Sequence, residues 1–146
     1  MTLWYNIPFL TILLVMASAL LVPLLKNGAR ALDLVRGVQL LSAAGSAWLL
    51  WVLSRTGESF VFQMGHFPAP WGNELRAGPL EALLALTFSL VMVLSLTGGA
   101  RELKESLPAK QLGWYCLLMQ LLFGALIAMV YTDDLFTAYV FVEIAA

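Results

Sequence analysis

The chain has 146 residues, of which 61% are apolar and 12% are charged, and its formal net charge is −1. Soluble domains carry about 25% charged residues, so this sequence lacks the polar surface of a water-soluble protein, in agreement with its mean hydropathy of +0.86. The near-neutral charge and the lack of a basic block exclude nucleic acid as a partner.

Long uncharged runs follow one another along the chain. Each approaches the ~20 residues that a helix needs to cross a hydrocarbon core of ~30 Å. A segment in lipid must satisfy its own backbone hydrogen bonds, which makes these runs helices. The sequence therefore predicts an all-α, integral membrane protein in which residues 1–146 form one membrane domain. We expect four complete transmembrane helices, at residues 3–25, 34–54, 79–98 and 111–132, and the start of a fifth at 135–146.

The first run could also be a cleaved signal peptide. However, residues 1–25 contain no Lys or Arg, and the apolar stretch is longer than a signal core. We therefore expect a retained span.

The segment between the second and third helices reads SFVFQMGHFPAPWGNELRA, from Ser59 to Ala77. Two apolar-rich stretches flank PAPWGN, whose Pro70, Gly72 and Asn73 form turns readily. This pattern predicts a short β-hairpin on the outer surface. The segment also holds His66, the only histidine, but no Cys lies nearby, so a metal site has no support. No nucleotide, iron–sulfur or hydrolase motif occurs, and we expect no cofactor and no catalytic residue.

The basic residues predict the orientation. Two lie in the second loop, Arg55 and Arg76, and none lies in the fourth. The first and third loops hold six, namely Lys26, Arg30, Arg36, Arg101, Lys104 and Lys110. Because cytoplasmic loops carry the excess of Lys and Arg, we expect a multi-pass protein of the inner (plasma) membrane with its N-terminus outside.

An acidic residue lies in the last apolar stretch. Asp133 and Asp134 mark the expected outer water boundary, and Glu143 lies nine residues after Asp134. In a helix this corresponds to a depth of about 13 Å, near the middle of the hydrocarbon core. A carboxylate there must be paired, hydrated or protonated, which suggests a proton or ion path. Alternatively, Glu143 belongs to a short tail that never enters lipid.

The fifth helix is also too short to cross. Ala146 lies twelve residues past Asp134, a rise of about 18 Å. We therefore expect either a piece of a longer polypeptide or a second subunit that completes and shields this helix.

Polar side chains inside the other helices have two interpretations. Gln120 lies half-way along the fourth helix, and Gln39, Ser42 and Ser46 lie along the second. They could line a hydrated path, together with Asp133 and Asp134, but intramembrane polar groups more often hydrogen-bond between helices.

Two segments, GHFPAPWGNELRAG and DDLFTAYVFVEI, carry a resemblance. They are similar to the N-terminal part of the antiporter-like subunits, a family that includes the D subunit of Mrp-type cation/proton antiporters. The large proton-pumping membrane subunits of complex I and of membrane-bound hydrogenases belong to the same family. The chain matches only the first four helices of these longer subunits and the start of the fifth.

The resemblance implies that Glu143 matches the fifth-helix glutamate of the family, which pairs with a lysine on the seventh helix to drive proton transfer. Lys26, Lys104 and Lys110 lie in or beside the expected cytoplasmic loops, so this chain has no such partner. We expect other membrane subunits to complete the H⁺ or Na⁺ path. The chain would then be a non-catalytic subunit of a redox-driven pump, NADH–quinone oxidoreductase-like or hydrogenase, or of an antiporter.

Two alternatives remain open. The chain could be a structural scaffold of such a complex that carries no ions, or a small four-helix membrane protein unrelated to these complexes. The second leaves the pattern around Glu143 unexplained.

Overall fold

A computed structural model describes residues 3–63 and 74–146 of the chain. The predicted PAPWGN turn and His66 lie outside the described residues. The chain is an all-α membrane protein. Four of its helices are long and apolar enough to cross a bilayer, which confirms that part of the sequence prediction. They are α1 (Ile7–Leu21, with 3₁₀ turns at Leu3–Asn6 and Val22–Leu24), α2 (Gly28–Thr56), α3 (Pro79–Gly98) and α5 (Ala109–Tyr131).

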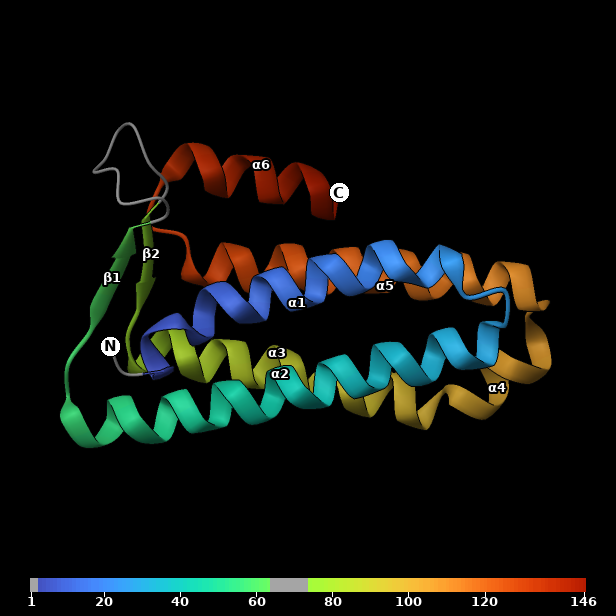
Figure 1. The fold of residues 1–146 in the computed structure, drawn as a ribbon, viewed down its shortest axis with the longest axis horizontal. Coiled ribbons are helices and arrows are strands. Elements are labelled where there is room, and N and C mark those ends of the chain that lie inside the picture. The colour runs from blue at the N-terminus through green and yellow to red at the C-terminus, as the bar shows by residue number, and fades with distance from the viewer. Residues whose placement is uncertain (1–2, 64–73) are drawn as a thin grey trace.

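The four long helices run up and down in sequence order and form a bundle (Figure 1). At one end, hereafter the hairpin end, lie a two-stranded sheet and the connection from α5 to α6 (Leu135–Ala145). The other end, hereafter the α4 end, holds the connection from α1 to α2, the short helix α4 (Ala100–Ser106) and the start of α5. Inside the bundle α2 and α5 contact each other, and α1 and α3 each pack against both.

The antiparallel sheet pairs β1 (Phe60–Gln63) with β2 (Glu74–Ala77). Leu75 and Ala77 are buried while Arg76 between them is exposed, so β2 covers the bundle with one face, as alternation along a strand requires. Leu75 also forms an isolated bridge with Thr132, just after α5. The hairpin end is thereby fastened to the segment that leads into α6.

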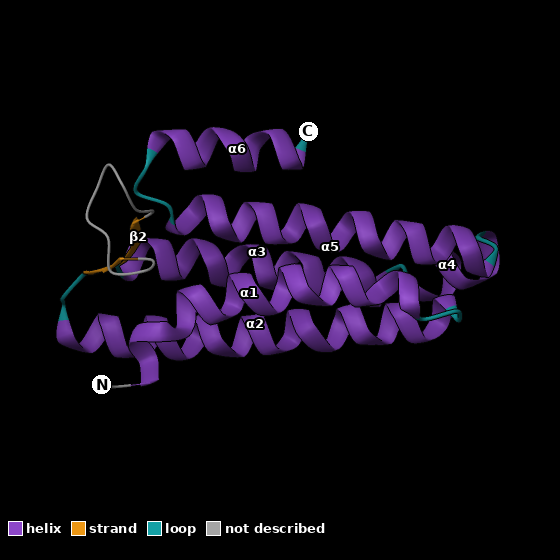
Figure 2. Cartoon of the chain, turned by 45° about the horizontal axis from the view of Figure 1, so that its top comes forward, coloured by secondary structure: helices purple, strands orange, loops and turns teal. Residues whose placement is uncertain are grey.

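The short helix α6 packs against α5 (Figures 1 and 2). In both views it starts at the hairpin end and stops part of the way along the bundle. It begins at Leu135, directly after its N-cap residue Asp134.

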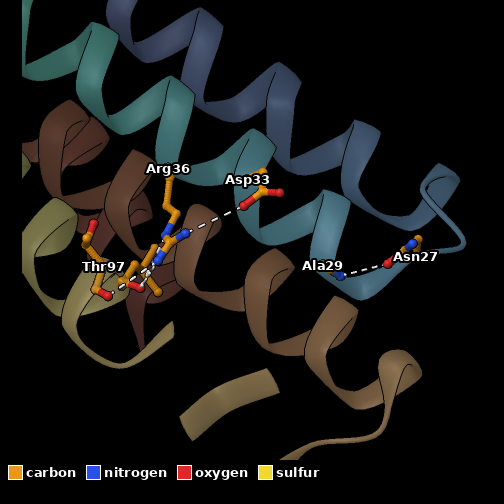
Figure 3. A network of polar contacts seen from close by, with 6 residues as sticks. Asn27, Ala29, Asp33, Arg36 and Thr97 are labelled. Carbon is orange, nitrogen blue, oxygen red and sulfur yellow. Dashed lines mark hydrogen bonds and ion pairs between the residues drawn. The ribbon is translucent and has the colours of Figure 1, made fainter. Parts of the chain in front are cut away.

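The second helix starts earlier than the sequence suggested. α2 begins at Gly28, whereas the sequence prediction places its start at 34, so Arg30 lies on the helix and not in a loop. The Asn27 side chain accepts a hydrogen bond of 3.0 Å from the Ala29 N–H and caps this end. Asp33 and Arg36 form an i,i+3 ion pair of 3.5 Å on the first turns (Figure 3). Charge therefore marks where the apolar span ends, and the helix continues beyond that point.

Arg36 also provides hydrogen-bond donors for the carbonyl groups at the C-terminal end of α3. Its guanidinium donates to the Leu96 carbonyl at 3.2 and 3.3 Å and to the Thr97 carbonyl at 3.4 Å (Figure 3). The last carbonyls of a helix lack intrahelical partners and carry partial negative charge. Arg36 supplies both the donors and the positive charge.

The expected third loop contains α4 as well. Arg101 and Lys104 lie on this helix, and Arg101 Nε donates to Glu105 Oε1 at 2.8 Å, one helical turn away. Lys110 lies in the first turn of α5.

Candidate functional site

A layer of polar side chains crosses the middle of the bundle. Gln39 Nε2 of α2 donates to Gln120 Oε1 of α5 at 3.4 Å, and Gln120 Nε2 donates to the Ser18 hydroxyl of α1 at 2.7 Å. Ser18 in turn donates to the Val15 carbonyl at 2.7 Å. All three side chains are buried. The network joins three helices that the sequence separates by as many as 102 positions.

Two apolar clusters lie on either side of this layer. Towards the α4 end, Val22, Leu32 and Cys116 belong to one cluster. Towards the hairpin end, Val15, Leu49, Leu53, Phe123 and Ile127 belong to the other. Along α1 and α5 the polar residue falls between the two clusters, whereas on α2 Gln39 directly follows Val38, the first α2 residue of the hairpin-end cluster. Close packing above and below fixes the helices in the rotation that lets the amides meet.

Not every polar atom in the bundle has a partner. Gln39 Oε1 and the Ser46 hydroxyl are buried, and neither has a hydrogen-bond partner within the described residues. Ser42, between them on the same face of α2, donates to the Val38 carbonyl at 2.9 Å. These groups are neutral, so the layer can hold the helices together or hold water but cannot itself carry a charge. The hydrogen bonds that join α1, α2 and α5 favour a role in holding these helices together over a role in an ion path.

The second candidate region is α6. Asp134 is its N-cap, and its carboxylate accepts hydrogen bonds from the N–H groups of Phe136 (3.3 Å) and Thr137 (3.1 Å) and from the Thr137 hydroxyl (2.7 Å). The Thr137 hydroxyl is the main reason why the pKa of Asp134 lies below its ordinary value. Asp133 is exposed, and its N–H donates to the Glu74 carbonyl at 3.0 Å. Both aspartates lie at the hairpin end, where they set the start of α6.

Glu143 lies on the last turn of α6 and is exposed on this chain. It accepts a hydrogen bond of 2.6 Å from the Tyr139 hydroxyl. Among the residues that the structure describes, the ion pairs join Asp33 to Arg36 and Arg101 to Glu105, and none involves Glu143. The carboxylate therefore receives one donor and no countercharge from this part of the chain.

The surroundings of Glu143 on α6 are apolar and exposed. Leu135 is 87% exposed and Phe136 is 75% exposed, and further large apolar side chains continue along the helix, namely Tyr139, Val140, Val142 and Ile144. Thr137 is the one buried residue of α6. Most of this helix thus presents apolar surface with one acidic group, and only a narrow face is used against the bundle.

The predicted site residues do not form one continuous site in the described residues. Gln120 is fully buried inside the bundle, whereas Glu143 is exposed on α6, and no hydrogen bond connects them. Sequence reasoning missed Tyr139 and Ser18 as partners. The spacing of four residues between Tyr139 and Glu143 could have indicated that pair, because such residues are neighbours on a helix. Nothing in the sequence indicates the Ser18–Gln120 pair.

The charges separate between the two ends. The α4 end carries six basic residues and three acidic ones (Asp33, Glu102 and Glu105), a balance of +3. The hairpin end carries two basic residues, Arg55 and Arg76, and five acidic ones (Glu58, Glu74, Glu81, Asp133 and Asp134), a balance of −3. Glu143, between the ends, accounts for the net charge of −1. No group of three or more potential metal ligands gathers in residues 3–63 or 74–146.

Two solved structures share this fold. The chain is similar to a subunit in the structure of the membrane-bound sulfane sulfur reductase, an archaeal respiratory membrane complex, with a TM-score of 0.79 and 25% identity over 96% of this chain. It is also similar to a subunit in the structure of the Mrp complex from Dietzia sp. DQ12-45-1b, with a TM-score of 0.82 and 20% identity over 99% of this chain.

Both likenesses cover a minor part of the neighbours. The chain spans 28% of the sulfane sulfur reductase subunit and 26% of the Mrp subunit. No protein-family model matches the chain, and a search of curated proteins found no match. The structural neighbours are thus membrane subunits of multi-subunit complexes, and they support a relationship to the antiporter-like subunits.

Proposed function

We propose that this chain is a membrane component of an ion-translocating complex and contributes Glu143 to a proton or Na⁺ path that other helices or subunits complete. The observation that carries the proposal is the exposed Glu143 carboxylate on the apolar surface of α6. The helix bears one carboxylate on a broadly exposed apolar surface, with Tyr139 as the only donor among the described residues and no countercharge. Such a group inside a membrane needs a polar partner or water, and intramembrane carboxylates are found in proton and ion paths.

The structural neighbours support this function. One is a subunit of an Mrp complex and the other a subunit of a respiratory membrane complex, and α1 to α6 align with about a quarter of each. The N-terminal-part assignment and the likeness to the Mrp D subunit rest on the segments around Trp71 and Glu143 in the sequence. The partners would then be further membrane subunits of such a complex, within the lipid bilayer.

The charge separation supports an orientation. With +3 at the α4 end and −3 at the hairpin end, the excess of Lys and Arg would place the α4 end in the cytoplasm of an inner-membrane protein. The N-terminus and the sheet would then lie outside, and Glu143 would be reached from the outer side.

The test replaces Glu143 by Gln in the purified complex that contains the chain, reconstituted into vesicles, with ion movement followed by a pH-sensitive or Na⁺-sensitive dye. Gln keeps the shape and removes the charge, so coupled ion movement should be abolished while the complex still assembles. Glu102→Gln on α4 is the matched control, because it removes an exposed carboxylate far from α6, and it should leave ion movement unchanged.

A scaffold role is the second candidate, favoured by the exposed Leu135 and Phe136 on α6, which a partner subunit could cover. Under that function the Glu143→Gln complex would move ions at the normal rate, and replacing Leu135 and Phe136 by Ser would detach the chain from the complex.

A further inference from the structure

A cavity of about 490 Å³ lies at the α4 end, between the turn that follows α1 and the first turns of α5. Val22, Leu25, Lys26, Lys110, Trp114 and Leu117 line it. Lys26 lies in the connection from α1 to α2 and Lys110 in the first turn of α5, whereas Val22 lies in the 3₁₀ turn after α1 and Trp114 and Leu117 lie further along α5. The cavity therefore has a cationic mouth and an apolar interior.

Both ammonium groups at the mouth are available. Lys26 and Lys110 are exposed, and neither forms an ion pair with a residue in the described part of the chain. The starts of α2 and α5 are also close together, because a Cβ on Gly28 would lie 2.6 Å from the Ala109 carbonyl oxygen. Ala109 and Lys110, in the first turn of α5, line the cavity, so the positive end of this helix adds to the two lysines. This corner of the bundle is suited to an anionic group.

The interior of the cavity suits an alkyl chain. Trp114 is 59% exposed, as is common for tryptophan at the boundary between hydrocarbon and water. Leu117 lies seven residues beyond Lys110 on α5, which is a rise of about 10 Å towards the middle of the bundle. A Cβ on Gly113 would meet no atom within 4 Å, so the floor of the cavity is open there.

We propose that this cavity binds an anionic phospholipid. Lys26 and Lys110 hold the phosphate group, and one acyl chain lies along Val22, Trp114 and Leu117. The ligand must combine negative charge with a long apolar tail in the membrane, and an anionic lipid does both. The site requires neither the ion path nor a particular orientation of the chain.

The test uses the purified complex in detergent and quenching of tryptophan fluorescence by brominated phosphatidylglycerol. The part of the quenching that is lost in the Trp114→Phe variant comes from Trp114 and therefore reports lipid bound in this cavity. We expect saturable quenching by phosphatidylglycerol and much weaker quenching by brominated phosphatidylcholine. Each basic residue near an anionic lipid surface strengthens binding about fivefold, so Lys26→Gln with Lys110→Gln should weaken it about 30-fold.

Two further variants make the result specific. Arg30→Gln with Lys104→Gln removes the same charge from exposed positions at the same end, outside the cavity lining, and should leave binding unchanged. Gly113→Leu fills the floor without changing charge and should also abolish the quenching of Trp114.

Three outcomes would overturn the proposal. Equal losses in the two double variants would mean that diffuse surface charge attracts the lipid. Equal quenching by phosphatidylcholine would mean an apolar groove without selectivity for the headgroup. Displacement of the lipid by millimolar inorganic phosphate would mean that the lysines bind free phosphate.

Discussion

The Tyr139 hydroxyl donates a hydrogen bond of 2.6 Å to Glu143 Oε1, one helical turn further along α6. The two side chains lie on the same face because residues four apart on a helix are neighbours. A short bond to a carboxylate is stronger than one between neutral groups. The phenol therefore orients the acidic group for whatever partner approaches α6.

Replacing Tyr139 by Phe removes this donor and keeps the ring. We expect the reconstituted complex to move ions severalfold more slowly, without the complete loss expected for Glu143→Gln, because the carboxylate remains but is no longer oriented. Dye-monitored vesicle flux measures the effect. Tyr115→Phe on α5, at the far end of the bundle, serves as control, and an equal effect of the two changes would argue against a role for the pair.

Replacing Gln120 by Leu breaks the polar layer. Gln39 and Ser18 each lose a partner in the buried bundle, and we expect a loss of about 1 kcal/mol in the free energy of unfolding. Thermal unfolding in detergent gives the value.

The double variant Gln39→Leu with Gln120→Leu replaces both amides by apolar groups. Its loss in the free energy of unfolding should be smaller than the sum of the losses in the two single variants, because neither amide remains without its partner. Strict additivity would mean that the 3.4 Å contact contributes nothing.

Two glycines of α2 offer a matched test of helix packing. A Cβ on Gly28 would lie 2.6 Å from a backbone oxygen, whereas one on Gly37 would meet nothing within 4 Å. Gly28→Ala should therefore destabilise the bundle by about 1–3 kcal/mol through the forced displacement of α5. Gly37→Ala should be neutral or stabilise by up to about 1 kcal/mol, as a change to a better helix former. Thermal unfolding of the two variants under identical conditions measures the contrast.

The cap at Asp134 should make the start of α6 sensitive to acid. Hydrogen bonds from Thr137 lower the pKa of Asp134 below its ordinary value of 3.8. A lowered pKa in the folded state means that this stabilisation is complete above the unfolded value and is lost as the pH falls through the folded one. Protection of the Phe136 and Thr137 amides from hydrogen exchange should thus be constant from neutral pH to about 5 and decline below about 4.

The variant Asp134→Asn keeps an acceptor without a titrating group. Its amide protection, corrected for intrinsic exchange, should not change over the same range. A wild-type protein with the same flat profile would show that the carboxylate does not contribute to the cap.

The four spanning helices could be predicted from the sequence, because an uncharged run as long as a bilayer is wide is compatible with few structures other than a transmembrane helix. The sequence was misleading where charged residues continue a helix beyond the apolar span, as Arg30 does on α2. Asn27 before Gly28 is the signal that would have placed this start correctly, since Asn is a preferred N-cap.

Contacts between distant segments could not be predicted. The bond from Gln120 to Ser18 depends on how α1 and α5 are rotated, which apolar composition does not determine when almost every position is apolar. The same holds for Arg36 and the carbonyl of Leu96, which are 60 positions apart. For the candidate site, the sequence located the carboxylate of Glu143 but not the phenol that binds it.

The link between β2 and the residues after α5 bears on how the protein is made. The Leu75–Thr132 bridge and the bond from the Asp133 N–H to the Glu74 carbonyl attach a late segment to a strand that the ribosome completes some sixty residues earlier. These contacts can form only after α5 has been synthesised, when β2 has already left the ribosome. The point at which the chain turns from α5 into α6 is therefore fixed by a strand that is made before both helices.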